Sequence, residues 1–264
     1  MSSIYQEKFF LSSSEGNAEQ QLSLPELTGN LIAVATSHAN SLGIGNPWME
    51  EQNMHAGWVL ARLTIEMTQY PEVNETYELK TWMESFTRHF SVRSFSISTD
   101  AKGICGYARS IWMVMDTENH TNVGLSHFHL APELIDGTQV PIPLQAKHTF
   151  IFPMEEADKA DAHSLTATSP AVKHRFLYCD LDSYRHVNTV RYVSLLLNQF
   201  TLKEHDDNMV NRLELSFLHE AKYGKETLLL RSEDKTERIN SFLLLDGEDK
   251  SPLMFARLFM KSRN

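Results

Sequence analysis

The sequence has little cysteine and no long apolar run, and these shortages exclude several classes of protein. It contains only two cysteines, Cys105 and Cys179, which form no CxxC pair, so we expect reduced thiols rather than a disulfide scaffold. No apolar stretch approaches the roughly 18–20 residues that span a bilayer. The first ten residues, MSSIYQEKFF, lack the basic and apolar regions of a secretory signal. These absences favour a cytoplasmic protein without a membrane span.

Positive charge is also scarce. The chain has 24 Lys and Arg against 34 Asp and Glu, a formal net charge of -10. Nucleic acids require basic surface, so we expect no nucleic-acid partner, and an acidic protein partner would need a local basic patch. No glycine-rich phosphate loop and no GxSxG elbow occurs. His127 and His129 have strand spacing for a metal, but no further ligand follows at a suitable distance, so we predict neither a metal nor a cofactor.

The chain repeats one order of elements: a strand, a helix and four strands. In the first half, residues 4–13 read as a strand, and a helix begins near Ser23, which has Glu26 at capping-box spacing. Gly43 and Gly45 end that helix. In the second half, the strand is 171–180 and the helix is 187–200, with Val190, Val193, Leu197 and Phe200 on one face. The later strand-like runs are 55–70, 76–86, 89–99 and 105–116, and then 211–221, 226–233, 238–247 and 251–260.

This order predicts an α+β fold in which each half wraps an antiparallel sheet around one central helix, with the two sheets joined edge to edge. Two unrelated α+β domains are the alternative, which the matching order disfavours. Residues 131–170 hold five of the nine prolines and the polar run EEADKADAHS, a composition typical of a linker. The predicted domains are therefore 1–130 and 171–264, separated by 131–170.

Polar side chains gather before the second helix, in the stretch CDLDSYRHVNTVRYVSLLLNQF. Asn188 and Thr189 suit a helix N-terminus, where free N–H groups would polarise a substrate carbonyl oxygen. His186 is a candidate base or hydrogen-bond donor for the same position, and Asp182 can orient the imidazole or a water. Each residue alone also suits a structural role, as a turn cap, a packing group or an N-cap. Their combination favours a functional site.

Glu220 stands at the end of the first strand after this helix. A strand that pairs beside the central helix can return its end to the helix N-terminus, and this would place Glu220 near His186. The structural alternative is a solvated carboxylate beside Lys222 and Lys225.

These residues resemble a known family. The segment DLDSYRHVNTVRYV is similar to the DxDxNxHVNNxxY motif of plant and bacterial acyl-acyl carrier protein thioesterases, and LELSFLHEAKYGKETL resembles their strand with a catalytic glutamate. The first-half strands resemble the family's tryptophan-flanked strands. The resemblance implies two tandem hotdog domains, with one active site in the second. It also implies hydrolysis of fatty acyl-acyl carrier protein, which releases free fatty acid and ends chain elongation. By position, Asp182, His186 and Glu220 match the family's catalytic residues.

Two departures from the family pattern matter for the mechanism. Tyr184 replaces an asparagine, and it either lends its hydroxyl or points away. Ala221 replaces a cysteine once proposed as a nucleophile, so a covalent mechanism would need Cys179 as the nucleophile. A lone cysteine at a strand end is more often a small apolar packing residue. We therefore expect direct hydrolysis, in which Glu220 activates water with or without His186.

The first helix carries no matching Asp, His and Asn cluster, so its half is expected to do no chemistry. The resemblance places acyl-chain selection there. Candidate tunnel residues are Gly29, Ala33, Ala35, Met49, Trp58, Met67 and Trp82, and core packing is the alternative for each. Candidate docking residues for the acidic carrier protein are Arg88, Arg93, Arg109, Arg185, Arg191, Lys222 and Lys225.

Three other functions fit the same pattern. They are an acyl-CoA thioesterase, a hydratase that acts on an enoyl thioester, and a non-catalytic fatty-acyl binding protein in which Tyr184 and Ala221 mark decay. The sequence leaves the oligomeric state open, with a homodimer as one alternative.

Overall fold

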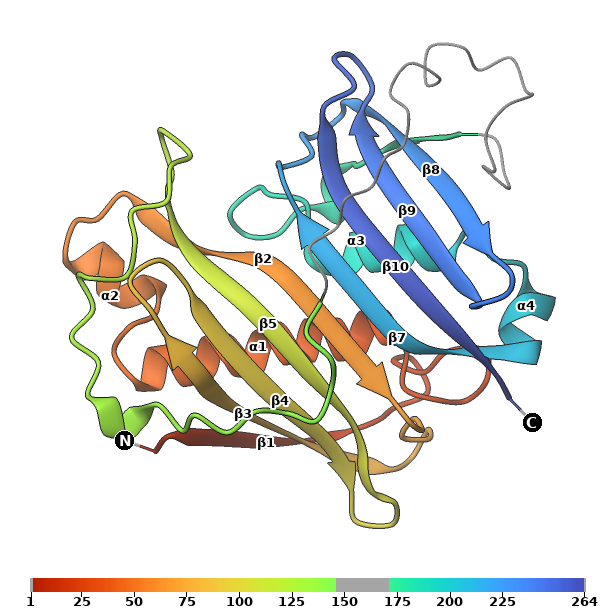
Figure 1. Ribbon diagram of the computed structural model, residues 1–264, viewed down its shortest axis with the longest axis horizontal. Helices are drawn as coiled ribbons and strands as arrows, with labels where there is room; N and C mark the ends of the chain where they lie inside the picture. The colour runs from red at the N-terminus through yellow and green to blue at the C-terminus, as the bar shows by residue number, and fades with distance from the viewer. Residues whose placement is uncertain (1, 146–170, 264) are drawn as a thin grey trace. The chain divides into compact units, whose positions relative to one another are not determined.

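The computed structural model describes residues 2–145 and 171–263, which divide into two compact units, Met1–Ile142 and Pro143–Asn264. Each unit combines a principal helix with an antiparallel sheet (Figure 1). Residues at the start of the predicted linker pack on the first unit, where Val140 and Ile142 contact Trp82. The polar run of that linker lies outside the described residues.

The first unit is a five-stranded sheet with two helices. Its neighbouring strands are antiparallel, in the order β1-β3-β4-β5-β2. The elements are β1 (Ile4–Phe10), α1 (Leu24–Ser41), α2 (Asn46–Glu51), β2 (Ala56–Met67), β3 (Thr76–Phe86), β4 (Ser91–Thr99), β5 (Gly103–Asp116) and the 3-10 helix η1 (Pro132–Leu134).

The second unit repeats this arrangement in the order β7-β10-β9-β8-β6. Its elements are β6 (Val172–Arg175), the 3-10 helix η3 (Tyr178–Asp180), α3 (Thr189–Leu197), α4 (Leu202–Asp207), β7 (Asn208–Phe217), β8 (Glu226–Asp234), β9 (Ile239–Asp246) and β10 (Pro252–Ser262). In both units, the strand before the principal helix pairs with the second strand after it. The predicted order of strand, helix and four strands is confirmed in each half.

The principal helices form because apolar residues recur along one side and polar caps begin each helix. In α1, Leu27, Leu31 and Val34 are buried, and the Ser23 hydroxyl caps the helix by accepting from Glu26 N–H at 3.3 Å. The second bond expected of a capping box, from Ser23 N–H to the Glu26 carboxylate, is not formed, and Glu26 Oε1 accepts from Asn30 Nδ2 instead. Among the helices of the described residues, none has the length and apolar character of a transmembrane span.

The structure differs from the prediction in its shorter elements. The six-residue helices α2 and α4 were not predicted, because so short a helix shows no apolar periodicity. Helix α3 covers only nine residues, so Phe200 lies beyond its end. Its buried residues are Tyr192, Val193, Leu195 and Leu196, so of the four predicted on one face only Val193 is fully buried.

Candidate active site

The loop that leads into α3 is shaped by the Asp182 carboxylate. Asp182 Oδ1 accepts hydrogen bonds from the N–H groups of Tyr184 and His186, each at 2.9 Å. The backbone closes the same turn, since Asp182 N–H donates to His186 O at 2.8 Å. Arg185 takes a positive φ of 66°, a backbone region that a tight turn requires. Asp182 therefore acts on His186 through the backbone, and the structure gives no bond between this carboxylate and the imidazole.

Asn188 continues the loop into the helix. Its side-chain oxygen accepts from Val190 N–H at 3.0 Å, and its carbonyl accepts from Arg191 N–H at 2.9 Å. Within the described chain, no acceptor bonds the N–H of Thr189, the first residue of α3. This N–H is therefore left for a ligand at the positive end of the helix.

Glu220 approaches the same loop from the segment after β7. That strand ends at Phe217, and Glu220 lies three residues beyond it. The N–H groups of Leu218 and His219 donate to Leu253 O at 2.9 and 3.2 Å, which holds the segment against the start of β10. The structure thus brings Glu220 back to the α3 end of its unit.

His186 and Glu220 form the chemically capable pair of this site. Nε2 of His186 lies 3.7 Å from Oε1 of Glu220, and the side chains are 51% and 41% exposed. This distance is too long for a hydrogen bond, so both groups are available to a third partner. An imidazole and a carboxylate in such proximity can accept, hold and return a proton.

Tyr192 supports the pair from within the helix, and the sequence interpretation missed it. Its buried hydroxyl oxygen accepts from Ala221 N–H at 3.3 Å, beside Glu220. Burial raises the pKa of Tyr192 to about 12, and the nearby Glu220 charge adds to the shift, although the Ala221 bond opposes it. The last residue of the family motif, DxDxNxHVNNxxY, corresponds to Tyr192 and could have identified it.

Other predicted residues lie at different places. Tyr184 is on the same loop and is 57% exposed. Cys179 is exposed in η3, and no bond joins it to His186 or Glu220 in the described structure. Met49 and Trp58 belong to an apolar cluster of the first unit, where Trp58 Nε1 donates to Ile44 O at 2.6 Å.

The structure corrects part of the predicted docking set. Arg93 and Arg109 are buried, so they cannot contact a partner, and their prediction as docking residues was wrong. Arg185 and Lys222 are exposed on the two loops that carry the pair. Lys225 is also exposed, but its Nζ lies 2.6 Å from Glu248.

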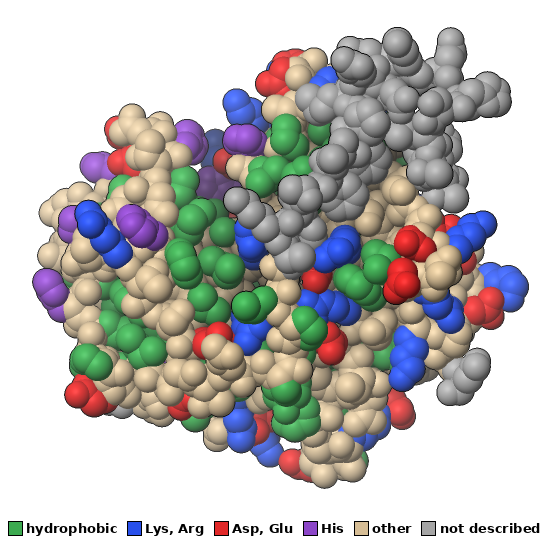
Figure 2. Space-filling model, in the orientation of Figure 1, with side chains coloured by type: hydrophobic (Ala, Val, Ile, Leu, Met, Phe, Trp, Pro, Cys, Tyr) green, Lys and Arg blue, Asp and Glu red, His purple; other side chains and the backbone are tan. Residues whose placement is uncertain are grey.

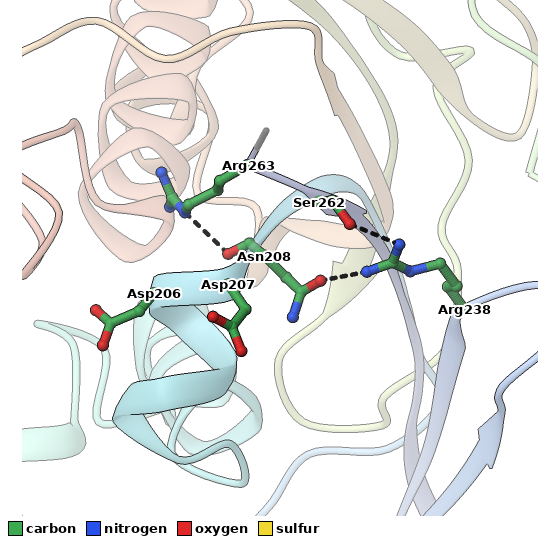
Figure 3. Close-up of a pocket in the computed structure, with 6 residues that line it drawn as sticks. All are labelled: Asp206, Asp207, Asn208, Arg238, Ser262 and Arg263. Carbon is green, nitrogen blue, oxygen red and sulfur yellow. Dashed lines mark hydrogen bonds between the residues drawn. The ribbon is translucent and has the colours of Figure 1, made fainter.

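A separate pocket of the second unit has a different character. Figure 3 shows the Arg238 guanidinium donating to Ser262 Oγ and to Asn208 Oδ1, and Arg263 Nε donates to Asn208 O at 3.0 Å. The pocket is lined by Asp206, Asp207, Asn208, Arg238, Ser262 and Arg263. This lining is entirely polar, so it suits an acyl chain poorly. Among the described residues, no group of three or more His, Cys, Asp or Glu side chains could hold a metal ion.

Comparisons with known proteins agree with this architecture. The family model of the acyl-ACP thioesterase N-terminal domain matches residues 2–126, and that of the C-terminal domain matches residues 164–253. A palmitoyl-acyl carrier protein thioesterase of Gossypium hirsutum is 23% identical over 86% of this chain and 54% of its own length. An oleoyl-acyl carrier protein thioesterase of Coriandrum sativum is 27% identical over 73% of this chain and 53% of its own. The chain thus spans about half the length of these relatives.

Solved structures show the same fold. An acyl-ACP thioesterase from Bacteroides thetaiotaomicron superposes with a TM-score of 0.82 at 22% identity, covering 98% of each chain. The 12:0-ACP thioesterase from Umbellularia californica gives a TM-score of 0.81 at 16% identity, covering 100% of this chain and 99% of the other. The helix and antiparallel sheet of each unit fit the hotdog fold. With both halves matched by the two family models, the chain belongs to the acyl-ACP thioesterase family.

Proposed function

We propose that the protein hydrolyses the thioester of fatty acyl-acyl carrier protein and releases a free fatty acid. The observation that carries this proposal is the 3.7 Å approach of His186 Nε2 to Glu220 Oε1 beside the start of α3. Such a pair can activate water, and the adjacent helix N-terminus can stabilise the charge that develops on a thioester oxygen. The free cysteines Cys105 and Cys179 suit the reducing cytoplasm expected from the sequence.

The reaction begins when Glu220 accepts a proton from a water molecule. The water oxygen attacks the thioester carbonyl carbon, and the N–H of Thr189 donates to the resulting oxyanion. When the tetrahedral intermediate collapses, the carbon–sulfur bond breaks, and the leaving sulfur takes the proton back from Glu220 directly or through His186. The products are a carboxylic acid and the carrier thiol, and no covalent enzyme intermediate is formed. Ala221 plays no chemical part, since it has no nucleophilic side chain.

Exposed apolar and basic side chains around the pair support a protein-bound substrate. The exposed large apolar residues of the two loops are Leu177, Tyr178, Tyr184, Leu218 and Tyr223. Aromatic groups of this kind are enriched at protein interfaces. On the face shown in Figure 2, acidic and basic side chains are interspersed. An acidic carrier is therefore expected to use a few local cations rather than an extended basic surface. Arg185 and Lys222 are the exposed cations nearest the pair along the chain.

The direct test is a panel of acyl-acyl carrier protein thioesters and the matching CoA esters, with free thiol and free fatty acid both measured. We expect faster release from the carrier-protein substrates, and a loss of about 100-fold or more in kcat for Glu220→Gln. Glu226→Gln is the matched control, because this carboxylate lies at the start of β8 in an exposed ion pair with Lys173.

Each rival function has its own outcome in this panel. Hydrolysis of CoA esters alone would identify an acyl-CoA thioesterase. Disappearance of an enoyl substrate without thiol release would identify a hydratase, and acyl binding without turnover would identify a binding protein. Near-normal turnover by Glu220→Gln would refute the assignment of Glu220.

A further inference from the structure

The first unit contains a buried arginine that lacks the kind of partner other buried arginines have. Arg109 and Arg212 are each 7% exposed, and each has a glutamate at 2.8 Å, Glu84 and Glu214 respectively. Arg93 is only 4% exposed, yet among the described residues no carboxylate lies within 4 Å of it. Burial lowers the pKa of Arg93 to about 10, with no acidic group opposing the shift, so the guanidinium is still charged at neutral pH.

One edge of the Arg93 guanidinium is bonded and the other is not. Nη1 donates to Nδ1 of His38 at 2.7 Å and to Oγ1 of Thr81 at 3.3 Å. Nε2 of His38 then donates to Ser2 O at 3.1 Å, which fixes a neutral imidazole with Nδ1 as the acceptor. Within the described chain, Nε and Nη2 of Arg93 have no acceptor.

The unbonded edge is the one that holds carboxylates elsewhere in this protein. Arg212 donates from Nε and Nη2 to Glu214 Oε1 at 2.9 and 2.8 Å. Arg257 uses the same two nitrogens on Glu214 Oε2 at 2.9 and 2.6 Å. A guanidinium presents these two N–H groups in parallel, which matches the geometry of a carboxylate. Arg93 thus has the recognition edge but no carboxylate of the chain on it.

The helix end beside Arg93 compensates its charge only in part. His38 lies in the last turn of α1, where the partial negative charge of the helix C-terminus favours a cation. That charge is about half a unit and supplies no acceptor to Nε or Nη2. A buried charge with unused donors is unfavourable unless a partner arrives.

We propose that Arg93 binds a carboxylate ligand through its Nε and Nη2 edge, inside the first unit. The neighbours of Arg93 on the inner face of the sheet include Met83, its cross-strand partner, and Phe95, two residues along β4. These apolar groups favour the carboxylate of a fatty acid, the product of the proposed reaction, and this choice of source rests on the proposed function. A small monocarboxylate would use the same edge without that dependence. Ser2, whose backbone oxygen bonds His38 Nε2, is itself exposed and directly precedes β1.

The test compares thermal unfolding of the lipid-free full chain in sodium acetate, laurate and dodecanol, with sodium chloride at matched ionic strength. The variants are Arg93→Met, which removes the edge, and Arg93→Lys, which keeps the charge without the paired donors. Arg88→Met is the control, because it removes an exposed cation of the same unit. We expect laurate or acetate to raise Tm by about 5 °C at a hundredfold excess over Kd. The rise should persist in Arg88→Met, vanish in Arg93→Met and need at least tenfold more ligand in Arg93→Lys.

Several outcomes would overturn the proposal. They are an equal rise in Arg93→Met, an equal rise with chloride, and a rise with dodecanol that matches laurate. If Arg93→Met does not fold, an unchanged ligand affinity in Arg93→Lys overturns it equally. Tighter binding of laurate than acetate identifies a fatty acid, whereas equal binding identifies a small carboxylate. This test measures binding and not turnover, so it is independent of the thioester panel. Laurate binding by a protein that the panel shows to be inactive would refute the proposed function and leave this site in place.

Discussion

The hydroxyl oxygen of Tyr192 lies 3.3 Å from the backbone nitrogen of Ala221 and accepts its hydrogen bond. Tyr192 belongs to α3, whose first turn follows the His186 loop, and Ala221 directly follows Glu220. One helix therefore holds both segments of the His186–Glu220 pair. The ring of Tyr192 is itself fixed between Phe176 and Phe217, with ring centroids 5.0 and 5.3 Å away.

Replacing Tyr192 by Phe should lower kcat while the protein stays folded. The ring still packs, but the buried Ala221 N–H loses its acceptor, so Glu220 is held less firmly. A lost hydrogen bond of about 1 kcal/mol corresponds to roughly a fivefold to tenfold fall in kcat. Because burial raises the pKa of Tyr192 to about 12, its hydroxyl stays protonated at ordinary pH, and the fall should be the same from pH 6 to 9.

Tyr77→Phe provides the matched control for this variant. Tyr77 is equally buried, its hydroxyl accepts from Asn30 Nδ2 at 2.8 Å, and burial raises its pKa to about 12 as well. It belongs to the first unit, whereas His186 and Glu220 belong to the second. If the two variants lose equal activity and equal stability, Tyr192 has only a structural role.

The role of Asp182 can be separated into shape and charge. Asp182→Asn keeps an oxygen that accepts from Tyr184 and His186 N–H, so kcat should fall less than about fivefold. Asp182→Ala removes the acceptor from both N–H groups, and the loosened loop should cost roughly tenfold or more in kcat. Steady-state kinetics on one acyl substrate measure both. Equal losses in the two variants would show that the negative charge matters and that the backbone bonds do not.

Much of the fold and half of the site could be predicted from local patterns. The order of elements can be predicted because apolar residues alternate every second position in the strands and recur every three to four positions in the helices. His186 and Glu220 meet because β7 follows α3 and its end returns to the start of that helix. Neither feature requires knowledge of individual side-chain contacts.

The remaining features depend on contacts that a pattern does not contain. Asp182 bonds to backbone N–H groups, and sequence spacing cannot separate this from a bond to the imidazole. Tyr192 looks like an ordinary residue of an apolar helix face. Arg93 is an arginine in a polar-looking stretch, which favours a surface position, but it shares one face of β4 with the buried residues Phe95 and Ile97. This spacing of two residues was the available signal.

Charge reversal at Lys222 should weaken carrier-protein substrates selectively. Lys222 is exposed two residues beyond Glu220, so a glutamate there would repel an acidic carrier without replacing His186 or Glu220. We expect KM for acyl-acyl carrier protein to rise about fivefold, equivalent to roughly 1 kcal/mol, and KM for acyl-CoA to rise less. The difference should shrink as salt is added.

Lys235→Glu is the control for this reversal. Lys235 is exposed just beyond the C-terminal end of β8, whereas Lys222 precedes the N-terminal end of that strand. Both variants replace a lysine by a glutamate, so they change the net charge equally. A similar rise in KM for both variants would indicate a general charge effect. No rise for either would exclude Lys222 from the docking surface.

His38 should make the protein lose stability as pH falls from 6.5 to 4. Burial, followed by the Arg93 charge, lowers the pKa of His38 from 6.5 to about 4, against a weaker opposing effect of the Ser2 bond. Above pH 6.5 the imidazole is neutral in the folded and unfolded states, so it adds no pH dependence. Between the two pKa values only the unfolded state binds the proton, which stabilises that state by about 1.4 kcal/mol per pH unit and by about 3 kcal/mol at pH 4.

Denaturant unfolding of the wild type and His38→Gln at pH 7, 5.5 and 4 measures this contribution. Glutamine does not titrate, so the free energy of unfolding of the wild type should fall by about 3 kcal/mol more than that of His38→Gln between pH 7 and pH 4. Carboxylates that titrate in the same range affect both proteins alike and cancel in the difference. His55→Gln, which replaces an exposed histidine, should follow the wild type at every pH. Parallel curves for the wild type and His38→Gln would mean that His38 titrates normally in the folded protein, and that Arg93 does not hold it neutral.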